Sequence, residues 1–178
     1  MTDHEKDLMQ WYIKAFLITT AFLAIILLPL LARAQEINID AIIQIESGGN
    51  PNAYNKKSGA IGLCQITPVV LKEFNNLNQN RLGCSISTYY LKSNPKINCE
   101  IAEWYLMKRI PQMLKYYLAK DYSSIKQIDL YIIACYNWGI NNVIKWHKKG
   151  ANFNQLPKET QKYWRKYNAL IKSKSDKF

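Results

Sequence analysis

The sequence predicts a mainly α-helical protein, with an apolar N-terminal segment ahead of one domain. Apolar residues recur at helical spacing in several stretches, and turn signals such as Gly48-Gly49 and Asn94-Pro95 separate these stretches. Hydrophobic residues make up 48% of the 178 residues and aromatic residues 12%, which is enough for a packed core and argues against disorder. An almost unbroken apolar run covers residues 15–31.

The apolar run is followed by Ala32-Arg33-Ala34, which has the small-x-small form of a signal peptidase site. The run is long for the apolar part of a signal peptide and slightly short for a comfortable membrane span. We therefore expect residues 1–34 to be a signal peptide or a signal anchor, with cleavage favoured, and residues 35–178 to be the exported domain. Export would place the domain in the periplasm or at the cell surface, with the membrane touched only through the N-terminal segment.

The formal net charge of +11 predicts an acidic partner. Nucleic acid, an anionic membrane surface and an anionic polymer would all satisfy this charge. The chain has neither zinc-ligand spacing nor an aromatic sheet signature, so we expect no nucleic-acid partner. His4 and His147 are its only histidines and neither belongs to a ligand cluster, so we expect no metal and no other cofactor.

A first helix is expected to begin at Asp40 as N-cap and to end at Gly48-Gly49, because glycine takes the left-handed turn without steric cost. Glu46 would then lie in the last helical turn. The negative end of the helix dipole and apolar neighbours would both raise the pKa of its carboxyl group. A carboxyl group that stays protonated near neutral pH can act as a general acid, whereas the ordinary alternative is a glutamate exposed to water at a helix end.

A polar loop leads from the first helix to the stretch Gly59–Gln65. Its two glycines allow the backbone to approach a ligand or a neighbouring helix closely. The amide of Gln65 can donate and accept hydrogen bonds, which suits a sugar hydroxyl or acetamido group. Thr67-Pro68 is typical of an N-cap followed by the first residue of a helix.

The middle of the chain is expected to alternate between helix and loop. Residues 69–77 form a short helix in this interpretation, and residues 75–91 form an irregular polar loop. Asn94 then caps a helix that has Pro95 as its first residue, and Pro111 ends or kinks that helix.

The last third of the chain is also expected to be helical. Residues 113–119 form a short helix, and either Ser123 or Ser124 caps the next helix, which runs into Tyr136. A basic helix closes the domain, and residues 172–178 are expected to be a frayed tail.

Three motifs carry a resemblance to a known family. E-S-x-x-N-P-x-A begins at Glu46, G-A-x-G-L-x-Q-I-x-P runs from Gly59 to Pro68, and Y-N-x-G begins at Tyr136. Together they resemble the soluble lytic transglycosylase (SLT) family, over most of the chain after about residue 37. The resemblance implies a single lysozyme-like catalytic domain, of the goose-type and SLT class.

The resemblance also implies a function and a set of site residues. It implies cleavage of the peptidoglycan glycan strand, with Glu46 as acid and base and with Tyr136 and Asn137 lining the cleft beside it. The candidate substrate-binding residues are Ser47, Asn55, Ser58, Gln65, Tyr136 and Asn137.

Some positions match the family loosely or depart from it. Glu159-Thr160 together with Tyr163 resembles the family's last substrate-side motif. Asn55 stands where the family usually has serine, so a nearby serine is the alternative source of that hydroxyl. Cys64 replaces the family's methionine, which changes the shape of the pocket wall.

The expected reaction cleaves the β-1,4 bond between MurNAc and GlcNAc and forms 1,6-anhydro-MurNAc. Glu46 is expected to act alone, because no other acidic residue lies between it and Gln65, Asp40 points to a different helix face, and Glu73 is expected to be solvated or to stabilise its helix.

The alternatives are a hydrolytic goose-type lysozyme and a catalytically inactive peptidoglycan-binding protein. The expected partner is the glycan strand. An enzyme that acts on this strand could serve general wall turnover, or it could open the wall locally for a secretion or conjugation apparatus.

The four cysteines, Cys64, Cys84, Cys99 and Cys135, allow three pairings. An oxidising compartment outside the cytoplasm would permit disulfides. We expect Cys84 to be bridged to Cys99, since these residues flank the long polar loop. Cys64 and Cys135 fall in predicted core elements and are expected to be either bridged or buried thiols.

Overall fold

The computed structural model describes residues 9–12, 14–20, 37–82 and 84–175. The chain divides into two units, Met1–Glu36 and Ile37–Phe178. In the first unit residues 9–12 and 14–20 are helical, and most of the predicted signal or anchor segment lies outside the described residues. Within the described ranges, no helix is both long enough and apolar enough to cross a bilayer.

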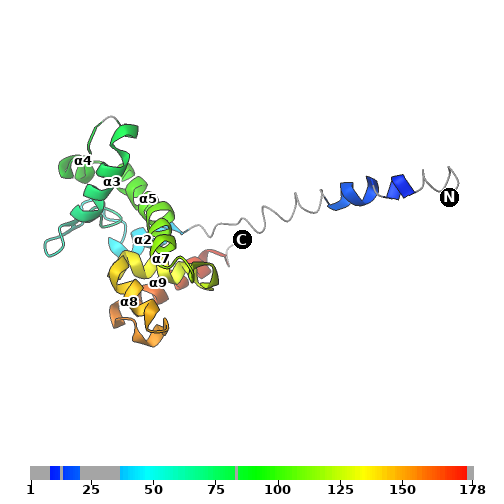
Figure 1. Ribbon diagram of the computed structural model, residues 1–178. Helices are drawn as coiled ribbons and strands as arrows, with labels where there is room; N and C mark the ends of the chain where they lie inside the picture. Colours follow the sequence, from blue (N-terminus) through cyan, green and yellow to red (C-terminus); the bar gives the residue numbers. More distant parts are fainter. Residues whose placement is uncertain (1–8, 13, 21–36, 83, 176–178) are drawn as a thin grey trace. The chain divides into compact units, whose positions relative to one another are not determined.

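The second unit is mainly helical, which confirms the predicted fold class (Figure 1). A short antiparallel hairpin pairs β1 (Tyr54–Asn55) with β2 (Ala60–Ile61). The helices are α2 (Ile39–Glu46), α3 (Pro68–Leu82), α4 (Thr88–Ser93), α5 (Pro95–Trp104), α6 (Ile110–Tyr117), α7 (Ile128–Trp138), α8 (Ile140–Lys148) and α9 (Lys158–Ser175).

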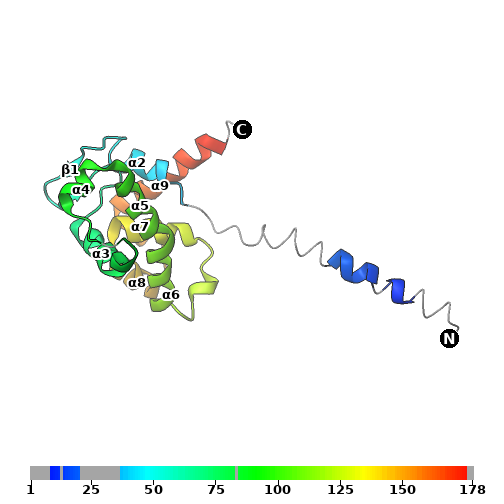
Figure 2. The same ribbon diagram turned by 90° about the horizontal axis from the view of Figure 1, so that it is seen from above.

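Helix α7 is the centre of this unit. Every residue from Asp129 to Cys135 is buried, as expected for a helix that is apolar on all sides. Helices α6, α8 and α9 pack against it, and α9 also packs against α2 (Figure 2). The central helix therefore brings the two ends of the domain sequence, α2 and α9, onto one core.

Helix α2 begins two residues earlier than the sequence predicted. Its N-cap is Asn38, whose side chain accepts a hydrogen bond of 3.0 Å from the backbone N–H of Ala41, while Asp40 lies in the first turn. The predicted cap at Asp40 is therefore wrong by two residues. Asparagine and aspartate are equally good N-caps, so residue type alone does not show which of the two positions caps the helix. The predicted C-terminal end is confirmed: Glu46 is the last helical residue, and Gly48 follows with a φ of 61°.

The predicted polar loop over residues 75–91 is largely helical, so that expectation is wrong. Helix α3 continues to Leu82, and α4 covers Thr88–Ser93. Asn75 holds the connection between them, because its side chain donates to the carbonyl of Ile86 at 2.8 Å and accepts from the N–H of Ile86 at 2.9 Å. A side chain that satisfies both backbone groups of a loop residue lets a polar helix and its following turn pack together.

Pro111 does not end the helix that contains it. The chain passes from α5 through a π-helical turn, Tyr105–Arg109, directly into α6, and Pro111 lies in the first turn of α6. The wider π turn takes up the distortion that a proline causes inside an α-helix. Asn94 caps α5 at Pro95 as predicted, by accepting from the N–H of Ile97 at 3.2 Å.

Two expectations in the later helices are also wrong. Ser123 and Ser124 lie in a short 3₁₀ turn, and α7 begins only at Ile128, with Gln127 in the N-cap position and no side-chain cap. At the C-terminus the helix α9 continues through the expected frayed tail to Ser175, and residues 176–178 lie outside the described residues.

The predicted bridge between Cys84 and Cys99 is not present, because all four cysteines are free thiols. Cys84 is exposed, whereas Cys99 on α5 is partly buried and lies near Cys64. Cys64 and Cys135 are both buried, which agrees with the alternative of buried thiols. Burial in apolar surroundings raises the pKa of both groups and keeps them unreactive.

Candidate active site

Glu46 lies at the end of α2 with its carboxyl group largely withdrawn from water. Burial is the largest influence on this group, and together with the negative charge of Glu159 it raises the pKa to about 7. A hydrogen bond of 2.8 Å from the hydroxyl of Tyr163 to Oε1 acts in the opposite direction, because it stabilises the carboxylate. Glu46 is therefore a carboxyl group that can hold or release a proton near neutral pH.

A pocket of about 300 Å³ opens beside Glu46. This volume is at the lower end of the range for small-molecule sites. Most of the site residues predicted from the sequence line it, together with side chains from α3, from the π-helical turn and from α9. The predicted residues in the lining are Glu46, Asn55, Ser58, Gln65, Tyr136 and Asn137.

Ser47 does not line this pocket. Its hydroxyl donates to the carbonyl of Ile43 at 3.2 Å and accepts from the N–H of Gly49 at 3.2 Å. Both bonds close the end of α2, next to the glycine turn. Ser47 therefore fixes the backbone beside Glu46, and a direct contact with a ligand stays a prediction.

Asn55 and Ser58 shape the hairpin loop as well as lining the pocket. The side-chain oxygen of Asn55 accepts from the N–H of Lys57 at 3.0 Å and from that of Ser58 at 3.3 Å. The hydroxyl of Ser58 accepts from the N–H of Ala60 at 3.3 Å. These bonds fold the loop back on itself, so asparagine at position 55 serves the loop in a way that serine could not fully match.

Gln65 has a positive φ of 50°, which is unusual for a residue with a side chain. Its amide nitrogen donates to the carbonyl of Ala53 at 3.2 Å and to the carbonyl of Gly62 at 3.1 Å. Both N–H groups are thus used within the protein. The pocket can therefore receive only the acceptor oxygen of this amide, and not the donor that the sequence also suggested.

Asn98 on α5 supports the loop that carries Gln65, a role that no motif in the sequence indicates. It is fully buried, donates to the carbonyl of Ile61 at 2.8 Å and accepts from the N–H of Cys64 at 2.8 Å. Gly62 lies directly against it with a φ of 80°, and a Cβ there would be 2.4 Å from Nδ2 of Asn98. The glycine is required both by its conformation and by this close approach.

Tyr136 and Asn137 reach the pocket from the end of α7. The hydroxyl of Tyr136 donates to the carbonyl of Cys64 at 2.5 Å, which ties α7 to the loop of Gln65. The side-chain oxygen of Asn137 accepts from the hydroxyl of Thr160 at 2.8 Å. Both side chains are therefore held by other parts of the chain before any ligand arrives.

Three further residues complete the surroundings of Glu46. Tyr105 lines the pocket, and burial raises the pKa of its hydroxyl to about 12. Glu159, in the first turn of α9, brings a second carboxylate to the lining. Burial raises the pKa of Tyr163, so that its hydroxyl stays protonated and donates to Glu46. In the sequence, a loose motif likeness points to Glu159 and Tyr163.

Glu73 lies outside the pocket lining. It forms an ion pair with Arg109, with Oε1 at 2.6 Å from Nη2 and 2.7 Å from Nε. This contact joins α3 to the π-helical turn and agrees with the structural role expected for Glu73. No group of three His, Cys, Asp or Glu side chains in the described ranges is arranged to hold a metal ion.

Comparison with known protein families finds a match. A family model described as "Transglycosylase SLT domain" matches residues 33–157, which is more than half of the chain. The matched range contains Glu46, Gln65 and Tyr136, and it ends just before α9. The comparisons with curated proteins and with solved structures find no match.

Proposed function

The chain belongs to the transglycosylase SLT family, and we propose that it is a lytic transglycosylase that cleaves peptidoglycan outside the cytoplasm. The proposed reaction breaks the β-1,4 bond between MurNAc and GlcNAc and closes a 1,6-anhydro ring on the muramic acid. One observation supports it above the others: the carboxyl group of Glu46, with a pKa of about 7, borders a pocket that also holds the polar side chains of Gln65 and Asn137.

The first step uses Glu46 as a general acid. A pKa of about 7 leaves about half of these groups protonated at neutral pH. The proton passes to the oxygen of the glycosidic bond as that bond breaks, so the departing sugar leaves as an alcohol. The bond from Tyr163 holds Oε1 in place and stabilises the carboxylate that this step produces.

The second step uses the same group as a base. The carboxylate of Glu46 takes the proton from the 6-hydroxyl of the muramic acid, and that oxygen forms a new bond to the anomeric carbon. An intramolecular nucleophile has the advantage of proximity over water. The proton returns to Glu46, so no second ionised group is needed to complete the cycle.

Neutral groups would position the sugar. The amide oxygen of Gln65 can accept from an acetamido N–H or a hydroxyl group, because its own N–H groups are already bonded to the backbone. Asn137 and Tyr136 offer polar atoms that α9 and the Gln65 loop hold in place. In this proposal the substrate's own acetamido group stabilises the positive charge that develops on the sugar ring.

Substitution of Glu46 by glutamine tests the assignment, because it keeps the shape and removes the acid. Release of soluble glycan from purified cell wall should fall about a thousandfold, while the circular dichroism spectrum stays unchanged. Glu100→Gln is the matched control, since Glu100 is exposed on α5 and absent from the pocket lining. If Glu46→Gln released glycan as fast as Glu100→Gln, Glu46 would not be the catalytic acid.

Hydrolysis is the second candidate, and the position of Glu159 favours it. Glu159 lines the same pocket as Glu46, so a second carboxylate is available to activate a water molecule. In that case the enzyme would be a goose-type lysozyme acting on the same bond. The products of the two reactions differ by one water molecule.

A further inference from the structure

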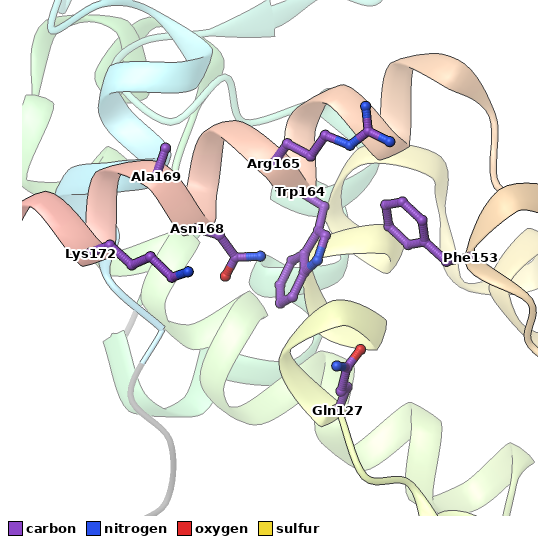
Figure 3. A pocket seen from close by; sticks show the side chains of 7 residues that line it. All are labelled: Gln127, Phe153, Trp164, Arg165, Asn168, Ala169 and Lys172. Atoms are coloured by element: carbon purple, nitrogen blue, oxygen red, sulfur yellow. The ribbon is translucent and has the colours of Figure 1, made fainter.

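A second hollow, here called the α9 pocket, lies along helix α9 (Figure 3). Its volume is about 500 Å³, and it shares no lining residue with the pocket at Glu46. Tyr163 of α9 contacts Glu46, whereas Asn168 lines the α9 pocket. Five residues separate these two, which corresponds to about 140° around an α-helix. The two pockets are therefore on different faces of the same helix.

The wall of the α9 pocket is an aromatic platform that the protein holds in place. The indole of Trp164 stacks on the ring of Tyr167, with centroids 6.0 Å apart and planes inclined by 20°, and Tyr167 is buried. In Figure 3 the indole extends from α9 toward Gln127, with the amide of Asn168 beside it. An aromatic face bordered by amides is suited to a sugar ring, which has apolar C–H groups on one face and polar groups at its edge.

One end of the α9 pocket is positively charged. The guanidinium of Arg165 lies 5.8 Å from the ring centre of Phe153, an arrangement that orders both side chains. In the part of the chain that the structure describes, Arg165 forms no ion pair with a carboxylate. The charge of Arg165 is thus available to a ligand in this pocket.

We propose that the α9 pocket binds an N-acetylated amino sugar that carries a carboxylate, such as a muramic acid unit of peptidoglycan. The sugar face would stack on Trp164, its acetamido and hydroxyl groups would pair with Gln127 and Asn168, and its carboxylate would pair with Arg165. This inference rests on the proposed function for the nature of the polymer. An uncharged amino sugar would leave Arg165 without a partner, and a nucleic acid would lack the acetamido group.

The separation of the two pockets gives this site a role on the intact wall. A muramic acid unit held in the α9 pocket belongs either to a neighbouring strand or to a distant part of the strand being cleaved, since the pockets lie on different helix faces. The site would thus raise the local concentration of glycan at the enzyme without entering the reaction. Cleavage of short soluble glycans should not depend on it.

The test follows the indole N–H signal of Trp164 in two-dimensional NMR spectra of the full-length Glu46→Gln protein, which binds without turnover. The signal is assigned by its loss in the additional variant Trp164→Phe. The probe is the disaccharide GlcNAc–MurNAc, which carries a lactyl carboxylate. Diacetylchitobiose is the matched probe, because it has the same acetamido sugars and no carboxylate. We expect the signal to shift with GlcNAc–MurNAc at about tenfold lower concentration than with diacetylchitobiose.

Paired variants on the same helix separate a specific site from general charge attraction. Arg165→Gln should weaken the GlcNAc–MurNAc titration about tenfold, and Arg165→Lys should restore part of the affinity. Lys166→Gln removes the same charge from an exposed residue outside the lining and should leave the titration unchanged.

Three results would overturn the proposal: no shift of the Trp164 signal, equal titrations in Arg165→Gln and Lys166→Gln, or an equal response to a single-stranded oligonucleotide. None of these readouts requires catalysis, so failure here is distinguishable from failure of the proposed reaction.

Discussion

The hydroxyl of Tyr163 donates a hydrogen bond of 2.8 Å to Oε1 of Glu46, across a sequence separation of 117 residues. The bond exists because α9 packs against α2 on the central core. Burial raises the pKa of Glu46 to about 7, and this bond limits the rise. The contact therefore adjusts how strong an acid Glu46 is and holds Oε1 in place.

Removal of this hydroxyl should change the pH dependence of the reaction. In Tyr163→Phe the carboxylate loses a stabilising donor, so the pKa of Glu46 should rise by about one unit. The alkaline limb of kcat/KM should then move to higher pH, and the rate at the optimum should fall because the carboxyl group is less well held.

A matched variant controls for the loss of a buried hydroxyl. Tyr131 is also buried, and its hydroxyl shares a hydrogen bond of 2.8 Å with the ring of His147, away from Glu46. Tyr131→Phe should leave the pH profile of the reaction unchanged. Identical profiles for Tyr163→Phe and the wild type would show that the bond does not control the acidity of Glu46.

Glu46 should also make the folded state less stable as the pH rises. Its pKa is about 7 in the folded protein and 4.5 as an ordinary glutamate, so the folded state binds the extra proton between these values. The free energy of unfolding should therefore fall from pH 4.5 to pH 7 by up to about 3 kcal/mol through this group.

Urea denaturation of the wild type and of Glu46→Gln at several pH values measures this contribution. The glutamine side chain does not titrate, so the difference between the two proteins should move in favour of Glu46→Gln as the pH increases. If the difference in the free energy of unfolding between the two proteins stayed constant from pH 4.5 to pH 7, the carboxyl group of Glu46 would already be ionised in the folded protein over this range.

The loop of Gln65 should be sensitive to a methyl group at Gly62. Gly62→Ala places a Cβ against the buried side chain of Asn98 and also forces alanine into a positive φ, so we expect a loss of stability of about 3 kcal/mol or more. Gly48→Ala is the matched change, because its φ is 61° and nothing lies within 4 Å of the added carbon. It should cost about 1 kcal/mol.

Chemical denaturation at a single pH compares the two glycine variants. We expect a clearly lower midpoint for Gly62→Ala than for Gly48→Ala, together with weaker activity, since Asn98 could no longer hold both Ile61 and Cys64. Equal midpoints would indicate that the approach of Asn98 to Gly62 is not a constraint on the fold.

Local signals in the sequence were sufficient for the parts of the fold that local chemistry determines. Thr67-Pro68 and Asn94-Pro95 mark helix starts because the cap and the proline act on adjacent backbone groups. The polar end of α3 was mistaken for a loop, since its stability depends on a contact between Asn75 and Ile86 and not on an apolar stripe.

The site could be predicted only in part, for a related reason. Gln65, Tyr136 and Asn137 were found through motifs, and the structure brings them to the pocket of Glu46. The second carboxylate of Glu159 and the donor Tyr163 come from a helix more than a hundred residues further on, and no spacing within the sequence reveals that α9 folds back against α2. The proximity of Cys99 to Cys64 likewise depends on how distant parts of the chain pack together, and no local pattern in the sequence indicates it.

The mass of the products distinguishes the transglycosylase reaction of Glu46 from hydrolysis. Purified glycan digested by the wild-type protein is separated and weighed by mass spectrometry. If Glu46 acts alone as acid and then base, the new muramic acid ends will carry the 1,6-anhydro ring, and Glu159→Gln will yield the same ends. Reducing muramic acid ends, heavier by one water molecule, would instead show that water is the nucleophile and would contradict the transglycosylase reaction.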